Sequence, residues 1–366
     1  MSSIIEGTPK KFHNSRITAA RFFLASFVIF VHLFPWYSFC STYNFYIINK
    51  INKLLVSAFQ KGGETNPAVL SFIVLSGYCI HRNGLRAHEI TVSHLKNFFK
   101  RRFFRIMPVY FLGIILGVTG FFCFSTNCSK LITATTEISV AALLGKVFAF
   151  PALCPLNFSD YYCGNAPLVT VGAEIWLYLT YPLGLLIIKK FGQSAFIKSI
   201  AVIIISGVVL CSVFPSFKGW WHNGSLFGFL PYWWIGVFFV NPPSVRPLYK
   251  KVFFGLFFLI TLVYFLVSKN LFVVEIRKLL LAILIGYFLH KMDKKKPLHN
   301  KPPFFLSNFM ESSYSLYAIH TPLIVFFIFY HFNPFVCLSV IYLSAYLIYI
   351  AYERPLTLQG KRPNAS

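Results

Sequence analysis

Apolar segments long enough to cross a lipid bilayer recur along the whole chain, and they constrain its fold more than any other feature. A bilayer core of about 30 Å is crossed by roughly 20 residues of apolar helix. The pattern therefore predicts an all-α, polytopic membrane protein with about ten transmembrane helices. The candidate spans lie at approximately 17–36, 67–82, 107–125, 167–188, 196–214, 224–240, 252–268, 271–290, 314–331 and 334–352.

Composition and charge agree with a membrane protein. Of the 366 residues, 57% are hydrophobic and 12% are charged, whereas a soluble domain carries about 25% charged residues. The net charge of +24 would suit nucleic acid, but basic residues also gather in the cytoplasmic loops of membrane proteins. With the N-terminus placed in the cytoplasm, the external segments hold only Lys50, Lys53, Lys61, Lys130, Lys146, Lys218 and Lys269. We therefore expect both termini to be cytoplasmic and no nucleic-acid partner.

The spans divide the chain into three predicted regions. These are a cytoplasmic N-terminal tail at 1–16, a membrane domain at 17–355 and a cytoplasmic C-terminal tail at 356–366. The first span has the basic start of a signal peptide, but no convincing small-residue cleavage site follows it, so we expect it to be retained.

The eight cysteines show no CxxC spacing, and no metal site is predicted. Four of them, Cys123, Cys128, Cys154 and Cys163, lie in or beside the external segment 126–166. In an oxidising compartment some of these would pair as disulfides. Small buried thiols are the alternative interpretation, and the sequence leaves both open.

The first span carries a basic residue at its foot and an imidazole inside it. Eleven helical steps of about 1.5 Å separate Arg21 from His32, which places His32 ~16 Å higher and near the middle of the bilayer. A polar residue at that depth is costly, so it is a functional hypothesis by default. The alternative is a histidine that is hydrogen-bonded between packed helices.

Two further features concern charge. Glu174 lies in the predicted fourth span, and the predicted eighth span contains Glu275, Arg277 and Lys278. Intramembrane charges usually pair. We therefore expect the three charges of the eighth span to pair with one another or with Glu174. The most basic loop ends in an amphipathic helix from His94 to Arg105, which we expect to lie in the membrane interface and to end at Pro108.

Five short motifs occur in one order along residues 16–355. They are Arg21 and His32 with ten residues between them, Phe72-Ile73-Val74-Leu75-Ser76-Gly77-Tyr78, Arg102-Phe103-Phe104-Arg105-Ile106-Met107-Pro108-Val109-Tyr110, Tyr314-Ser315-Leu316-Tyr317-Ala318-Ile319-His320-Thr321-Pro322, and Tyr352-Glu353-Arg354-Pro355. In these motifs the chain resembles the acyltransferase-3 family of integral membrane acyltransferases. One element departs, because Val169-Thr170-Val171 stands before Glu174 where that family commonly has Trp-Ser-Leu.

The resemblance implies transfer of an acyl group, usually acetyl, from cytoplasmic acyl-CoA to a hydroxyl on a carbohydrate or lipid-linked glycan. Acetyl-CoA would be a co-substrate, with no cofactor bound permanently. His32 would be the general base, because a neutral imidazole can take the proton of an attacking hydroxyl. We expect Glu174 to orient His32 or the acceptor hydroxyl, unless it pairs with Arg277 or Lys278. His320 would donate to the developing oxyanion, or only pack.

The same resemblance implies a donor site at the cytoplasmic interface. Arg102 and Arg105 share one helix face, and guanidinium groups match phosphate oxygens in paired hydrogen bonds. We expect them to hold the coenzyme A phosphates, with Arg21 as a further contact and Ser76 as a lesser candidate. Alternatively, Arg102 and Arg105 are a basic anchor that binds lipid head groups. The alternative for Arg21 is that its side chain only snorkels to the membrane interface.

These features together predict a membrane O-acyltransferase of the bacterial inner (cytoplasmic) membrane that modifies a surface polysaccharide such as lipopolysaccharide O-antigen. A carrier or flippase for a glycolipid or small solute, with His32 and Glu174 as a proton relay, is the first alternative. Carriers often show inverted repeats and broken helices, and neither is found in the sequence. A non-enzymatic scaffold is the second alternative, although it would not need an intramembrane His and Glu.

Overall fold

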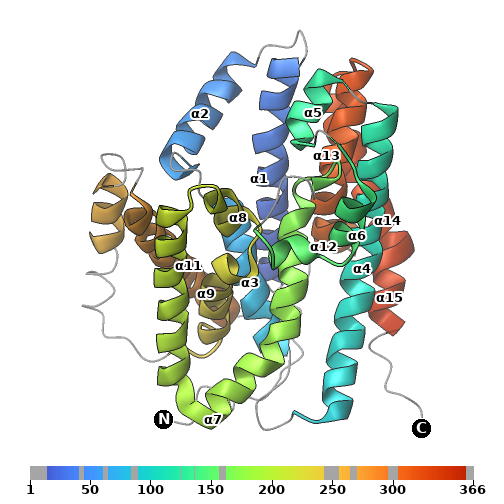
Figure 1. Ribbon diagram of the computed structural model, residues 1–366. Helices are drawn as coiled ribbons and strands as arrows, with labels where there is room; N and C mark the ends of the chain where they lie inside the picture. Colours follow the sequence, from blue (N-terminus) through green and yellow to red (C-terminus); the bar gives the residue numbers. More distant parts are fainter. Residues whose placement is uncertain are drawn as a thin grey trace. The chain divides into compact units, whose positions relative to one another are not determined.

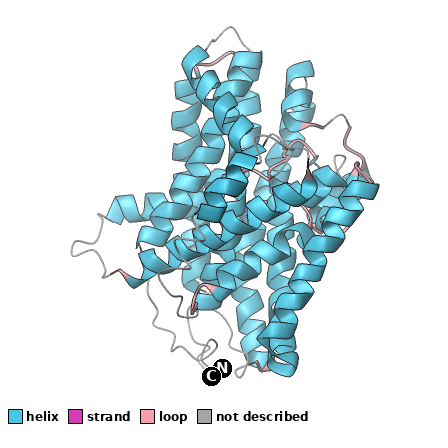
Figure 2. Ribbon diagram, turned by 90° about the vertical axis from the view of Figure 1, so that its left-hand side faces the viewer, coloured by secondary structure: helices cyan, strands magenta, loops and turns pink. Residues whose placement is uncertain are grey.

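The structure is a computed structural model, and it describes residues 15–40, 45–60, 65–83, 90–124, 126–135, 137–155, 162–242, 255–263, 270–295 and 304–359. Regular structure in these residues is helical throughout, and Figure 2 draws no strand among them. The predicted all-α fold is confirmed for this part of the chain. Most of the predicted tails, at 1–14 and 360–366, lies outside the described residues.

The segment predicted as one membrane domain contains two compact units. Unit 1 consists of Met1–Ile17, Leu55–Leu95 and Leu177–Pro297, and unit 2 of Thr18–Leu54, Lys96–Trp176 and Leu298–Ser366. Figure 1 labels the helices of both units in chain order.

Unit 1 is built around the close contact of two helices. Its main helices are α3 (Pro67–Asn83), most of α7 (Leu168–Val213), α8 (Phe217–Asn223), α9 (Leu226–Phe238) and α11 (Leu271–Lys294). Among the described residues, α3 and α9 form the most extensive contact between two helices. Gly77 faces the Trp233 carbonyl and Gly236 faces the Val74 carbonyl at distances that leave no room for a side chain. The small residues of the predicted second span therefore do permit close helix packing.

Unit 2 contains most of the first helix and the last fifth of the chain. Its elements include most of α1 (Ser15–Cys40) and of α4 (Val92–Cys123), α5 (Asn127–Thr133), α6 (Val140–Val147), η2 (Phe150–Ala152), α12 (Phe304–Glu311), α13 (Ser313–Phe329), α14 (Pro334–Ile348), η4 (Tyr349–Glu353) and α15 (Arg354–Gln359). The helix α2 (Tyr46–Gln60) has residues in both units, and a further helical segment at 255–263 lies in unit 1. Aromatic rings join α1 to the late helices, with Phe22 and Phe309 centroids 5.0 Å apart and Phe34 and Phe335 centroids 6.1 Å apart.

The expected break at Pro108 is wrong. The helix α4 runs without interruption from Val92 to Cys123 and passes through this proline. A proline removes one backbone hydrogen bond and crowds the carbonyl four residues earlier. Here the residues around it, Ile106, Val109 and Tyr110, are buried, and their packing outweighs that local cost.

Four helices are long and apolar enough to cross a membrane, by length and composition: Ser15–Cys40, Val92–Cys123, Leu168–Val213 and Pro334–Leu356. Two shorter apolar helices are Pro67–Arg82 and Ser313–Phe329. These helices are typical of a membrane protein, but within the described residues they number four and not the predicted ten.

The difference between the predicted and the observed number of membrane-length helices has identifiable causes. The helix α7 joins the predicted spans 167–188 and 196–214 into 46 residues that bend at Gly192, whose φ of 83° only glycine adopts readily (Figure 1). The helix α9 has 13 residues and is shorter than the span predicted there. The helix α11 is long enough, but Glu275, Arg277, Lys278 and its charged last turn interrupt its apolar character. The predicted span 252–268 is described only at 255–263.

Candidate active site

Two histidines that lie 288 positions apart in the sequence meet in unit 2. Nδ1 of His32 on α1 is 3.0 Å from Nε2 of His320 on α13. The two rings are nearly parallel, with centroids 5.3 Å apart and an interplanar angle of 11°. His320 is fully buried, whereas His32 is half-buried. Both histidines had been predicted as site residues, and the structure brings them into direct contact.

The hydrogen bonds determine which nitrogen of each ring carries the proton. Nδ1 of His320 is 2.7 Å from the Tyr317 carbonyl oxygen, which can only accept, so this nitrogen must donate. In the neutral ring Nε2 of His320 is then an acceptor, and it receives the Nδ1 proton of His32. The Thr321 hydroxyl also lies 3.2 Å from Nε2 of His320. Nε2 of His32 is therefore left with its lone pair, and it makes no hydrogen bond within the described part of the chain.

The ring of Trp36 stacks on the His32 ring. Its ring centroid is 4.5 Å from that of His32, with an interplanar angle of 7°. Residues four apart share a helix face, so α1 itself brings the two rings together. Sequence reasoning missed Trp36, although an aromatic residue four positions after a candidate base was a usable signal.

Glu174 belongs to the same unit and lies within electrostatic range of Tyr317, whose backbone carbonyl accepts a hydrogen bond from His320. The Tyr317 phenol is hydrogen-bonded to the Thr170 side chain. The Tyr317 ring centroid is 5.7 Å from that of His320. Thr170 is the hydroxyl retained in the stretch that departs from the family motif, and it contacts the site at this point.

The three predicted donor arginines all lie in unit 2, and two of them share a counter-ion. Glu353 in η4 is buried, accepts a hydrogen bond from the Ser315 hydroxyl, and interacts electrostatically with Arg105 and Arg21. Arg102 lies one turn before Arg105, and its guanidinium carbon is 5.7 Å from the Phe98 ring centroid. The sequence predicted this grouping of cations but gave no role to Glu353.

Ser76 is placed differently from the other predicted site residues. It belongs to unit 1, where its hydroxyl is 2.9 Å from the Tyr178 hydroxyl and accepts a hydrogen bond of 3.3 Å from Nε1 of Trp233. The structure therefore gives Ser76 partners within unit 1.

Unit 1 contains a second buried polar cluster, between α8, α9 and α11. Nζ of Lys278 is 3.2 Å from both Oε1 of Glu275 and Nδ1 of His222. Oε1 of Glu275 also accepts a hydrogen bond of 3.2 Å from Nε1 of Trp221, and Oε2 accepts one from Tyr232. Of the two pairings expected for these charges, the structure shows Glu275 with Lys278. Sequence reasoning missed the three residues from α8 and α9.

The segment predicted as the longest external one, 126–166, folds around a buried lysine. Lys146 on α6 is 1% exposed, and its ammonium donates to the Asn165 carbonyl at 3.1 Å and the Tyr162 carbonyl at 3.4 Å. Burial lowers the pKa of Lys146 from 10.5 to about 7. On its opposite face α6 exposes Val140, Leu144 and then Phe148, as expected of a segment that lies on the membrane.

This buried lysine predicts a pH-dependent stability. Between about pH 7 and 10.5 the unfolded chain binds the Lys146 proton and the folded chain does not, so stability should rise with pH across this window. Thermal unfolding in detergent at pH 7 to 9.5 should show a rise in Tm that is smaller for Lys146→Met. Lys130→Met, at an exposed lysine of the same segment, should keep the wild-type slope. An equal slope in Lys146→Met would contradict the assignment.

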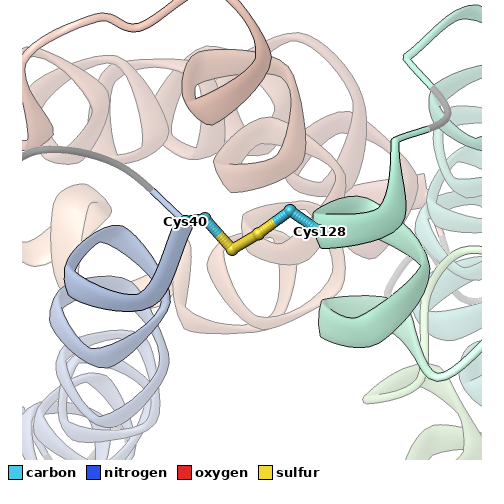
Figure 3. The surroundings of a disulfide bond; sticks show 2 residues. All are labelled: Cys40 and Cys128. Atoms are coloured by element: carbon cyan, nitrogen blue, oxygen red, sulfur yellow. A yellow bond between two sulfur atoms is a disulfide. The ribbon is translucent and has the colours of Figure 1, made fainter.

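One disulfide joins Cys40 at the end of α1 to Cys128 in α5, with a Cα–Cα distance of 5.8 Å (Figure 3). Of the predicted candidates, Cys128 is paired, and its partner Cys40 was not among them. The other three candidates, Cys123, Cys154 and Cys163, form no disulfide within the described residues. A persistent disulfide requires an oxidising compartment, which agrees with an external position for 126–166.

Among the described residues, no three His, Cys, Asp or Glu side chains gather in a way that could hold a metal ion. Comparisons of the chain with protein-family models, with curated proteins and with solved structures find no match.

Proposed function

We propose that the protein is a membrane O-acyltransferase that moves an acyl group, normally acetyl, from cytoplasmic acyl-CoA to a hydroxyl of a cell-surface carbohydrate such as lipopolysaccharide O-antigen. The observation that carries this proposal is the hydrogen-bonded pair of His32 and His320 on two apolar helices, which leaves the lone pair of His32 Nε2 available. A half-buried imidazole with this tautomer is suited to general-base chemistry.

In the proposed reaction, Nε2 of His32 takes the proton of the acceptor hydroxyl as the oxygen attacks the thioester carbonyl carbon. The tetrahedral intermediate then collapses, the carbon–sulfur bond breaks, and the coenzyme A sulfur takes the proton from the His32 imidazolium. The products are an ester and a free thiol, and His32 returns to its starting state. A general base needs a neighbour that orients it and accepts the hydrogen bond from its other ring nitrogen.

We assign His320 the role of orienting His32. Its Nδ1 proton is committed to the Tyr317 carbonyl and its Nε2 lone pair accepts from His32, so the neutral ring has no N–H left for an oxyanion. Glu174 is placed beside Tyr317, from where it would receive the acceptor hydroxyl or support this chain of hydrogen bonds. Ser76 has no role in this proposal.

The donor would bind at Arg102, Arg105 and Arg21. These cations lie toward the start of α1 and in the first half of α4, and coenzyme A phosphates are anions that guanidinium groups bind in paired hydrogen bonds. We place this end in the cytoplasm, because the disulfide at the other end of α1 requires an oxidising compartment. A bacterial inner membrane with both termini in the cytoplasm satisfies both conditions.

The double variant Arg102→Gln/Arg105→Gln should bind acetyl-CoA about 10–100-fold more weakly, since a hydrogen bond to a charged group contributes about 1.5–3 kcal/mol. The remaining binding should depend less on salt, because fewer charge contacts are screened. Isothermal titration at two ionic strengths measures both effects. Arg101→Gln removes an exposed charge from the same helix and should have little effect. Unchanged donor affinity in the double variant would make the pair a topological anchor only.

Consumption of the thioester tests the proposal as a whole. Purified protein in detergent should convert labelled acetyl-CoA to free coenzyme A and acetylated glycan when an acceptor extract is present. A carrier or flippase would move the glycolipid without consuming the thioester, and that result would favour the alternative function. In that case His32 and Glu174 would form a proton relay.

A further inference from the structure

The last turn of α1 lies beyond a proline and carries the residue that stacks on His32. Pro35 has no N–H, so the Val31 carbonyl lacks its usual helical partner and the turn from 36 to 40 is less well held by the backbone. Trp36 lies in this turn, with its ring parallel to the His32 ring at a centroid distance of 4.5 Å. The position of Trp36 therefore depends on what fixes the turn.

Side chains hold this turn: Tyr37 is fully buried and hydrogen-bonded to Cys337, and Cys40 and Ser38 make two further tethers. The disulfide between Cys40 and Cys128 joins the end of the turn to α5 (Figure 3). The Ser38 hydroxyl accepts a hydrogen bond of 2.7 Å from Nδ2 of Asn49 and one of 3.4 Å from the Phe45 N–H. The disulfide is covalent and can be removed chemically, which makes it the tether whose contribution can be measured.

The stacked indole has an electrostatic consequence for a base. The face of an indole ring carries negative potential and attracts a cation placed over it. When His32 takes a proton, the charge appears on a ring that already lies on this face. His320 cannot offset that charge by accepting further, because its one lone pair already receives the His32 Nδ1 proton.

We infer that Trp36 is a positioning residue for His32, held in place by the Cys40–Cys128 disulfide, and that it stabilises the imidazolium formed during acyl transfer. This inference rests on the proposed function. It also implies that reduction of the disulfide from the external side slows the reaction without affecting donor binding.

The pH–rate profile of acetyl transfer tests the role of Trp36. Trp36→Leu should lower kcat about tenfold and leave the KM for acetyl-CoA unchanged, and the acid limb should move to lower pH because the imidazolium has lost its stacking partner. Trp36→Phe retains an aromatic face and should recover most of the rate. Phe39→Leu, at an exposed position of the same turn, should keep the wild-type profile. An acid limb in Trp36→Leu that coincides with the wild type would overturn the inference.

A second comparison tests the disulfide. In the double variant Cys40→Ser/Cys128→Ser the acid limb of the pH–rate profile should also move to lower pH. The shift should be smaller than in Trp36→Leu, because the hydrogen bonds of Ser38 still hold the turn. Adding Trp36→Leu to that pair should give no more than Trp36→Leu alone, since both changes act through one contact. Additive effects, or an unchanged profile in the serine pair, would refute the link between disulfide and base. If the wild-type protein does not consume acetyl-CoA at all, the proposed function itself fails. If the wild-type protein is active but the pH–rate profile is the same in the variants, only the inference about Trp36 and the disulfide fails.

Discussion

His32→Ala is expected to lower the rate of acetyl transfer by about 10²–10⁴-fold, which is the usual contribution of a general base. The loss should appear in kcat, because the imidazole acts on the reacting hydroxyl and makes no contact that the proposal assigns to the donor. Turnover of labelled acetyl-CoA by the purified variant measures it. The protein should still insert and fold, because His32 is only half-buried and contributes one hydrogen bond to His320.

Two comparisons make this result specific. His331→Asn changes an exposed histidine of the same unit at a positive φ that asparagine tolerates, and it should retain wild-type turnover. His320→Ala should reduce turnover less than His32→Ala, because it leaves the base in place without its orienting partner. Wild-type-like turnover in His32→Ala would exclude His32 as the base.

Lys278→Met is expected to destabilise the folded protein by about 3–5 kcal/mol, the usual cost of removing one partner of a buried ion pair. The variant leaves the Glu275 carboxylate buried at 3% exposure, beside the Trp221 and Tyr232 donors and with Nδ1 of His222 3.4 Å from its Oε1. It also removes the hydrogen bond to His222. The measurement is the free energy of unfolding of the detergent-solubilised protein, followed by tryptophan fluorescence.

The matched changes for this prediction lie on the same helix. Lys294→Met removes an exposed lysine from the last turn of α11 and should change the stability little. Glu275→Leu/Lys278→Met removes both charges and should recover part of the loss, because a hydrophobic pair carries no desolvation penalty. A Lys278→Met variant as stable as the wild type would show that the cluster is not held by this ion pair.

The helical class and the position of α1 could be predicted because they follow from local hydropathy. The span predicted at 17–36 lies within Ser15–Cys40. A local signal failed where tertiary packing outweighs it, because α4 continues through Pro108. The bend of α7 at Gly192 falls between the two spans predicted at 167–188 and 196–214. Short buried helices such as α9 match a membrane span in composition but not in length.

The candidate site was predictable in its residues and not in its contacts. Motif order grouped His32, His320 and the arginines, but no local pattern shows that His32 meets His320 or that Cys40 meets Cys128 across 88 positions. The roles of Glu353 and Trp36 depend on which helices pack together, so they became visible only in three dimensions. Ser76 lies in unit 1, and its assignment to the donor site stays a prediction.

Mass spectrometry of surface glycans tests the central claim most directly. Glycans are compared from cells that express the wild-type protein, cells that lack it, and cells that express His32→Ala at an equal level. Acyl transfer predicts a glycan species heavier by one acetyl group per modified sugar in the first cells only. Identical glycan masses in all three, with the protein present in the membrane, would contradict the proposed acyltransferase function.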